Sequence, residues 1–411
     1  MTTEITAIIK GFKEFSEDPY QDTINFLEEY LEVEESDEAL FELGKALFFK
    51  GDHDESVKCL NKSGDVRADA YLGLNCFKRE DFKNAIMHFS EFLEKSENET
   101  VLNYLMLSYE KQTDWENAIK TGKRLLEINP KNSSVKLHLI DDHFNLEEFE
   151  KCIKCIDEMN DSKLEIKRGL ALFRLKRYDD AIRTLEKIKT PESWELLSEI
   201  YEELEKPAKA IMYLNRSYES TGNVEMLFKI SEIHCRNKRY ESSIDAMERV
   251  LAEDPENERA LERITKIYAE TQNIHFMIEY GEKLLKVNEK NVTGYIALNR
   301  AYYLSSDRQK SMEIIERGLE MCPKSPELWI EKAWIVYPDD FEAFKRNFER
   351  GLELDPNNTK DFVKLIDKCI WEDEPDNARK YYERLVFYNP LFEKSFDDIV
   401  HDIESWKSLI I

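Results

Sequence analysis

The sequence predicts an all-α solenoid built from helix-turn-helix repeats, and three observations support this prediction. First, a pattern of about 34 residues recurs from near residue 37 almost to the C-terminus of the 411-residue chain. Second, the later half of most copies has an aromatic or apolar residue, a small residue three positions on and then isoleucine, as in Phe82, Ala85 and Ile86. Third, several copies close with a proline.

The pattern can be followed copy by copy. Further examples of the second half are Trp115, Ala118, Ile119; Phe149, Cys152, Ile153; Tyr178, Ala181, Ile182; and Tyr240, Ser243, Ile244. The first half carries two large apolar residues, a small one and another large one, as in Trp194, Leu197, Ser198, Tyr201. The closing prolines are Pro130, Pro255, Pro323, Pro356 and Pro390. Because the apolar positions share one helical face, each half is predicted to be an amphipathic helix.

These residue types and offsets resemble those of the tetratricopeptide-repeat family, whose unit has about 34 residues. The resemblance covers nearly the whole chain. It implies a right-handed superhelix of paired helices. Because members of this family share a scaffold and bind unrelated partners, the resemblance implies a binding role without identifying the partner.

The repeats can be placed in order by aligning the small residue of each second helix. Eleven repeats are predicted, starting near residues 37, 66, 99, 133, 162, 191, 224, 258, 292, 326 and 359. The units that start at 37, 133 and 162 are about five residues short of the usual length. Helix-stopping residues arrive early in them, at 61–65, 160–162 and 189–191. Their second helices are therefore predicted to be about one turn shorter.

Small residues are expected where the two helices of a repeat lie closest. The predicted close pairs are Gly44 with Ser56, Gly73 with Ala85, and Gly169 with Ala181. A larger side chain at such a position would push the helices apart, at a cost of about 1 to 3 kcal/mol.

The ends of a repeat array need covers, because each unit leaves an apolar face that its neighbour must bury. Residues 4–15 and 20–32 have the periodicity of two amphipathic helices. An apolar stripe near the C-terminus comprises Phe392, Phe396, Ile399, Ile403 and Trp406. We predict N-terminal capping helices in residues 1–36, the repeat array in 37–390 and a C-terminal amphipathic capping helix in 391–411. An alternative for the last segment is docking into a partner or a second copy.

Composition narrows the classes of partner. With 59 Lys and Arg against 85 Asp and Glu, the net charge is −26, which disfavours direct binding of nucleic acid or anionic membranes. The same charge would attract a basic protein, although it also serves solubility. The first 15 residues lack the apolar run of a signal peptide, and no segment approaches the roughly 20 apolar residues of a membrane span. Seven cysteines without regular spacing fit a reducing compartment, and we expect the cytoplasm.

Two groups of residues could be read as chemical sites. Cys152 and Cys155 form a CxxC pair, but Cys152 occupies the small core position and no second pair exists, so core packing is favoured over metal or redox chemistry. The ligand-type residues His138, Asp141, Asp142 and His143 crowd one first helix. Such a group arises readily by chance in a chain with 35% charged residues. Phosphate-loop, nucleophile-elbow, kinase and metalloprotease signatures are missing. We expect a non-enzyme with no cofactor and no metal site.

The family resemblance implies which first-helix positions line the concave face: the second, fifth, ninth, twelfth and thirteenth. In the first five repeats these positions include many large apolar residues. The predicted partner-binding groove consists of Phe41, Phe48, Leu74, Phe77, Leu107, Leu137, Phe144, Ile166, Leu170 and Phe173. Repeats nine to eleven supply Ile296, Arg300, Tyr303, Trp334, Tyr337, Val363 and Trp371 at such positions. The alternative for the aromatic residues is packing between repeats.

The sixth repeat differs, because glutamate occupies all five positions. We call this set the acidic wall: Glu192, Glu195, Glu199, Glu202 and Glu203. Like charges at i, i+4 destabilise a helix by a few tenths of a kcal/mol per pair, so their accumulation favours a role in binding.

Together these features predict a non-catalytic scaffold or adaptor that holds a protein segment in the groove. Basic residues of the segment are expected to lie against the acidic wall. It is expected to work inside a larger assembly. Two alternatives remain open: an acidic holding chaperone for basic proteins, and a regulatory or recruiting subunit of a multi-protein enzyme complex.

Overall fold

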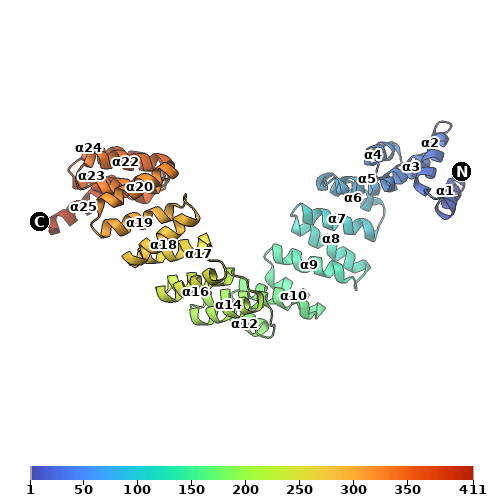
Figure 1. Ribbon diagram of the computed structural model, residues 1–411. Coiled ribbons are helices and arrows are strands. Elements are labelled where there is room, and N and C mark those ends of the chain that lie inside the picture. Colours follow the sequence, from blue (N-terminus) through green and yellow to red (C-terminus); the bar gives the residue numbers. More distant parts are fainter. Residues whose placement is uncertain (1, 411) are drawn as a thin grey trace. The chain divides into compact units, whose positions relative to one another are not determined.

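The computed structural model describes the backbone of residues 2–410 and the side chains of residues 5–403 except residue 15. The described backbone holds 25 α-helices, one short 3₁₀ turn and no β-strand (Figure 1). The predicted all-α solenoid class is therefore confirmed. The chain divides into two compact units, residues 1–205 and 206–411. We call them the N-terminal unit and the C-terminal unit, and within each unit consecutive helices pack against one another.

The N-terminal unit contains thirteen helices and the 3₁₀ turn Ser162–Leu164. The helices are α1 Thr2–Phe15, α2 Pro19–Leu31, α3 Asp37–Lys50, α4 His53–Lys62, α5 Arg67–Lys78, α6 Phe82–Lys95, α7 Glu99–Lys111, α8 Trp115–Ile128, α9 Ser133–Asn145, α10 Phe149–Met159, α11 Glu165–Arg174, α12 Tyr178–Leu185 and α13 Pro191–Glu203.

The C-terminal unit contains the other twelve described helices. They are α14 Pro207–Thr221, α15 Glu225–Arg236, α16 Tyr240–Glu253, α17 Glu258–Glu270, α18 Ile274–Val287, α19 Val292–Leu304, α20 Arg308–Met321, α21 Pro326–Val336, α22 Phe341–Leu354, α23 Thr359–Trp371, α24 Pro375–Tyr388 and α25 Phe396–Ile410. In the repeat pattern α13 and α14 make up the sixth repeat, so the two units divide inside that repeat.

The repeat boundaries agree closely with the sequence pattern. First helices begin at each predicted start or one residue later, except in the fifth repeat, where the 3₁₀ turn delays α11 to Glu165. The short second helices are also confirmed. Helices α4, α10 and α12 have 10, 11 and 8 residues, whereas α6, α8 and α16 each have 14.

Recurring caps and turns explain why helices start and stop at these places. Side-chain oxygens of Ser36, Asn98, Asn132, Asn257 and Asn291 accept hydrogen bonds from the free amides that begin first helices. In most repeats the turn between the two helices contains one left-handed residue. Gly51 supplies it in the first repeat, with φ +95°. Non-glycine residues adopt it elsewhere, at Glu80, Thr113, Glu147, Lys176, Lys238, Gln272, Ser306 and Asp373.

The close approach of paired helices is confirmed, and in the first repeat the predicted pair meets directly, because a Cβ atom on Gly44 would lie 3.2 Å from the Ser56 carbonyl oxygen. The nearest side chain comes from one turn further along the second helix: a Cβ atom on Gly73 would lie 2.5 Å from the Phe89 ring. In the same way, Gly44 lies against Leu60 and Gly169 against Leu185. Each partner comes four residues after the predicted one, because helical side chains lean back toward the N-terminus of their helix. In the first repeat Ser56 also takes part, since its hydroxyl donates to the Gly44 carbonyl oxygen at 2.7 Å.

The terminal helices cover the ends of the described array. Ile5 and Ile9 of α1 and Ile24 and Leu27 of α2 share one apolar cluster with α3. At the other end, Ile399 of α25 is buried against the core of α21 to α24. Phe392 packs there too, although it precedes the helix, and the side chain of Trp406 lies outside the described residues. These contacts fit capping roles, and the boundaries at 36 and 390 stay a prediction.

Among the described helices, none is both long enough and apolar enough to cross a bilayer.

Candidate functional site

The structure uses the predicted aromatic groove residues largely for packing. The Phe77 ring lies 5.4 Å from that of Phe82 and 5.2 Å from that of Tyr104 in the next repeat. The same contact recurs between Phe144 and Phe149, at 5.2 Å. Each of these first-helix rings packs on the aromatic residue that begins the second helix of its own repeat. The packing alternative therefore accounts for part of this surface.

Phe41 requires a correction. The sequence predicts it on the groove surface, but only 1% of it is exposed. The next first helix covers it, because the Tyr71 ring lies 5.6 Å away and the Arg67 guanidinium lies 4.2 Å from the Phe41 ring centre. Phe41 is thus a core residue that cannot contact a partner.

The other predicted groove residues keep some exposure. Leu137 is the most open of them, at 40%. Half-buried positions are Phe48, Leu74, Phe77, Leu107, Phe144, Ile166, Leu170 and Phe173. Leu74 and Leu107 also pack on the core of repeats two to four. Their role as a binding surface stays a prediction.

The five glutamates of the acidic wall all lie on α13. Glu192, Glu199 and Glu203 are exposed, while Glu195 and Glu202 are half-buried. The wall therefore presents carboxylates to solvent, and its binding role stays a prediction.

A cavity of about 570 Å³ lies in the C-terminal unit, along the first helices α17, α19, α21 and α23. We call it the C-terminal groove. Five residues that the sequence placed on the concave face line it: Ile296, Arg300, Tyr303, Trp334 and Tyr337. Val363 and Trp371 belonged to the same predicted set but are not among its lining residues. Its volume is in the range of small-molecule and peptide side-chain sites.

One wall of the C-terminal groove is apolar and accessible. Tyr303 and Leu304, the last residues of α19, are each 45% exposed. Trp334 is held in place from behind, because its ring lies 5.2 Å from Phe344 and 5.8 Å from Phe348, both fully buried. This wall therefore combines a fixed aromatic ring with open apolar surface.

The second wall, formed by residues of the same helices and of α23, is a network of charged groups. Arg300 donates to Glu331 from Nε at 3.0 Å, and the Asn299 amide donates to the other Glu331 oxygen at 2.8 Å. Ser311 in turn donates to the Asn299 side-chain oxygen at 2.6 Å. These bonds fix the carboxylate of Glu331 and orient Arg300, whose side chain is 54% exposed. Lys364 and Asp361 form a second pair at 2.7 Å.

Tyr337 contacts charged residues with both its hydroxyl and its ring. Its hydroxyl donates to Glu372 at 2.6 Å, and the Lys368 ammonium lies 4.5 Å from its ring centre. Burial, followed by the Glu372 hydrogen bond, raises the pKa of Tyr337 to about 12. The hydroxyl therefore stays a neutral donor across the physiological range.

Sequence reasoning missed the Asn299 network. Asn299 occupies the first-helix position that carries Ser198 in the sixth repeat and Gly73 in the second. An amide at that small-residue position was the available signal, because a buried amide needs several hydrogen-bond partners.

The positions of Cys152 and Cys155 agree with the prediction that this CxxC pair serves core packing. Cys152 is fully buried, and burial raises the pKa of its thiol to about 11. Burial also raises the pKa of the half-buried Cys155. Because the thiolate is the metal ligand and the nucleophile, this environment favours core packing.

The ligand-type residues on α9 turn to separate partners. His138 Nδ1 lies 2.9 Å from Glu110, His143 Nδ1 lies 2.7 Å from Glu148, and Asp141 pairs with Lys167. Asp142 is 1% exposed, and its Oδ2 atom has no hydrogen-bond partner among the described residues. His138, Asp141 and His143 thus contact three separate partners, and the four side chains do not converge on one point.

Comparisons with known proteins agree with this architecture. The family model described as "Tetratricopeptide repeat" matches residues 37–65 and 191–223. The model described as "Anaphase-promoting complex, cyclosome, subunit 3" matches residues 111–188.

One curated relative is a TPR repeat-containing protein of Methanocaldococcus jannaschii. It is 21% identical over 285 residues, which covers 62% of this chain and 50% of the relative. The chain therefore spans about half the length of that protein.

Among the solved structures that align with this chain, one with a TM-score above 0.5 shows a similar fold. A structure of Naa15/Naa10 bound to HypK-THB has a TM-score of 0.52 and 13% identity, covering 92% of this chain and 67% of that one. A tetratricopeptide repeat protein from Parabacteroides merdae has a TM-score of 0.43 and 15% identity, covering 59% of this chain and 98% of that one.

Proposed function

Because this chain belongs to the tetratricopeptide-repeat family, we propose that it is an adaptor that holds an extended segment of a partner protein in the C-terminal groove. The observation that carries the proposal is the groove itself, a cavity of about 570 Å³ formed by consecutive first helices. We further propose that the adaptor works in the cytoplasm, as part of a larger assembly.

The two walls of the groove suggest what a segment must offer. Tyr303, Leu304 and Trp334 form an apolar wall suited to one large aliphatic or aromatic side chain. Arg300, held by Glu331, offers guanidinium surface to a carbonyl or carboxylate oxygen of the segment. Because Trp334 and Arg300 are already held by neighbouring residues, ordering these two side chains loses little entropy on binding.

A paired substitution tests this groove. Tyr303→Ala with Leu304→Ala removes apolar surface that binding would bury, and we expect the affinity for the partner segment to fall about tenfold or more. The partner is first isolated from source-cell lysate by affinity purification and identified by mass spectrometry. Its binding segment is then titrated calorimetrically against the purified chain.

The matched control is Phe387→Ala, a similarly large apolar truncation at a position that is 76% exposed and outside the groove lining. It should leave the affinity unchanged. Equal affinities for wild type, groove variant and control would rule out the C-terminal groove as the binding site. Equal circular dichroism spectra are needed first, to show that all three proteins are folded.

The acidic wall supports a second, electrostatic contribution to binding. We propose that basic residues of the partner lie against α13, where Glu192, Glu199 and Glu203 are exposed. Glu199→Gln with Glu203→Gln should then weaken binding at low salt and flatten the dependence of log Kd on salt concentration. Calorimetry at two or more salt concentrations measures this slope, and Glu253→Gln, an exposed glutamate on α16, is the control. An unchanged slope would show that the acidic wall does not contribute to binding.

The net charge of −26 also supports the alternative of an acidic holding chaperone. Such a chaperone would capture many basic proteins, all released by salt and all retained by the Tyr303→Ala, Leu304→Ala variant. A partner kept at moderate salt and lost from that variant supports the adaptor instead. The remaining alternative, a recruiting subunit, differs from the adaptor only in that the retained partner is an enzyme.

A further inference from the structure

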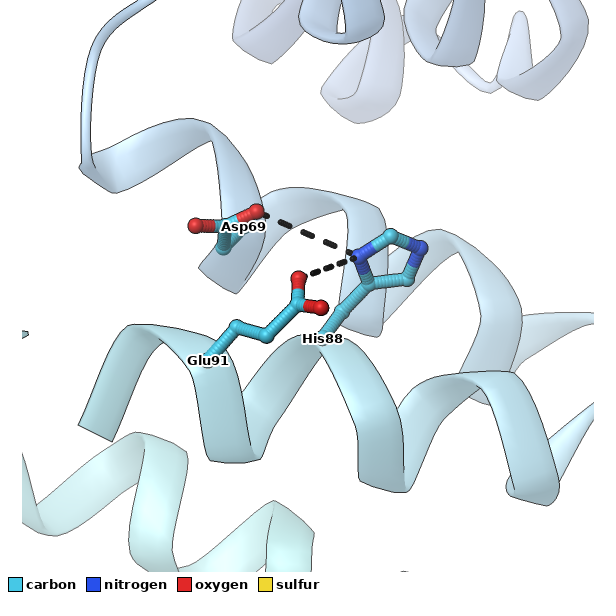
Figure 2. A group of neighbouring side chains, drawn as sticks. All are labelled: Asp69, His88 and Glu91. Carbon is cyan, nitrogen blue, oxygen red and sulfur yellow. Dashed lines mark ion pairs between the residues drawn. The ribbon is translucent and has the colours of Figure 1, made fainter. Parts of the chain in front are cut away.

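Three potential metal ligands converge between the two helices of the second repeat. Asp69 lies on α5, while His88 and Glu91 lie three residues apart on one face of α6. Figure 2 shows the two carboxylates turned toward the same imidazole nitrogen. His88 Nδ1 lies 4.0 Å from Asp69 Oδ1 and 3.8 Å from Glu91 Oε2.

The His88 nitrogen lacks a hydrogen bond. Nδ1 is buried and has no hydrogen-bond partner among the described residues, because both carboxylates lie beyond hydrogen-bonding distance. Buried polar atoms in native proteins nearly always have a partner. A buried ring nitrogen that faces two carboxylates without a hydrogen bond fits a site in which a cation lies between the three groups.

We propose that Asp69, His88 and Glu91 bind a divalent transition-metal ion, with zinc as the best match. One ligand atom from each residue lies within 4.8 Å of the others. Zinc takes imidazole nitrogen and carboxylate oxygen at about 2.0 to 2.2 Å, and water can occupy the fourth position. Magnesium and calcium prefer oxygen ligands alone, so the imidazole selects against them.

The surrounding contacts allow the small closure that binding requires. The side chain of Glu91 is 50% exposed and can rotate toward the ion, whereas those of His88 and Asp69 are each 19% exposed. Lys95 contacts the other Asp69 oxygen, Oδ2, at 3.1 Å, which leaves Oδ1 directed at the histidine. The Lys95 ammonium lowers the affinity of the cluster for a cation by repulsion. Its contact also orients the Asp69 carboxylate.

A bound ion would link α5 to α6 and stabilise the repeat. This site is separate from the C-terminal groove, so the proposal does not depend on the proposed adaptor function. The sequence does not reveal this metal site, because the ligands come from two helices, with 18 residues between Asp69 and His88, and have no recognised spacing.

The test uses the full chain, freed of metal by chelation and dialysis and kept reduced. Zinc chloride and magnesium chloride are titrated calorimetrically into wild type and into Asp69→Asn, His88→Gln and Glu91→Gln. We expect one tight zinc equivalent in wild type, an affinity more than about tenfold weaker in each variant, and no comparable magnesium binding. The melting temperature of wild type should rise with zinc.

The matched control is Glu94→Gln, which removes an exposed carboxylate from the same helix outside the cluster. It should bind zinc as wild type does. The seven free cysteines could also bind zinc, so cobalt is substituted and its spectrum recorded. Absence of sulfur-to-cobalt charge transfer is expected.

Equal zinc affinity in wild type and Glu91→Gln, no zinc binding, or a thiolate spectrum would each overturn the proposal. Because Glu91 is exposed, Glu91→Gln is expected to fold, and the test therefore stays valid even if His88→Gln does not fold.

Discussion

Replacing Phe89 by alanine is expected to destabilise the N-terminal unit by about 3 to 5 kcal/mol. The side chain is 0% exposed, and its ring fills the space above Gly73. It also stacks 6.1 Å from the Tyr104 ring of the next repeat. Removing it therefore creates a cavity that loosens the second repeat and its junction with the third. Urea unfolding measures the loss, and amide hydrogen exchange should locate it in α5 to α7, because repeat arrays unfold locally.

The control for this prediction is Phe387→Ala, since that ring is 76% exposed. It should change stability by less than about 0.5 kcal/mol. If both substitutions cost the same, Phe89 would not be the packing centre of the second repeat.

A double-mutant cycle tests the Gly73 contact more directly. Gly73→Ala would place its Cβ 2.5 Å from the Phe89 ring, and Phe89→Leu alone leaves a cavity. Together they should cost less than the sum of the separate effects, because the smaller side chain makes room for the methyl group.

The stability of the N-terminal unit is expected to fall as the pH rises from about 4 to about 7, and Asp142 is the cause. Burial, followed by the negative charges of Glu110 and Asp141, raises the pKa of Asp142 from its ordinary 3.8 to about 7. Below pH 3.8 the carboxyl is protonated in both the folded and the unfolded chain. Between the two pKa values only the folded chain keeps the proton, so stability is lost with rising pH and the loss is complete above pH 7.

Asp142→Asn removes this titration while keeping the shape of the side chain. We expect the variant to be more stable than wild type at pH 8 by about 2 to 4 kcal/mol, and similar to it at pH 4. Urea unfolding at a series of pH values measures the difference. Glu150→Gln is the matched control, because this carboxylate on α10 is exposed and does not contribute to the raised pKa of Asp142, so it should leave the slope between pH 4 and 7 in place. Parallel stability curves for wild type and Asp142→Asn would contradict the assignment.

The fold could be predicted from the sequence because each repeat carries its own periodic signal. The small residues Ala85, Ala118 and Ala181 each lie three positions into a second helix, and aligning them placed the repeat starts. The three short second helices could also be predicted, because helix-stopping residues arrive early in those repeats. The delay of α11 was missed because a 3₁₀ turn at Ser162–Leu164 satisfies the same local preferences as a helix start.

The candidate site was harder to predict, because exposure depends on neighbouring side chains. Phe77 and Phe144 hold positions that the family places on the concave face, yet each ring packs on the aromatic residue five positions later, Phe82 or Phe149. That spacing is visible in the sequence and could have indicated packing. The groove between α17 and α23 carries no such signal, since its volume depends on how the Tyr303 and Trp334 side chains leave space beside the Asn299 network.

The most direct test of the adaptor proposal is site-specific photo-crosslinking in source-cell lysate. A benzophenone amino acid replaces Tyr303 in one variant and Phe387 in another, and crosslinked peptides are identified by mass spectrometry. The groove account predicts that position 303 captures one recurring segment of one partner, with a large apolar residue at its centre, and that position 387 does not. The same partner segment captured equally at both positions, or no recurring segment at position 303, would contradict it.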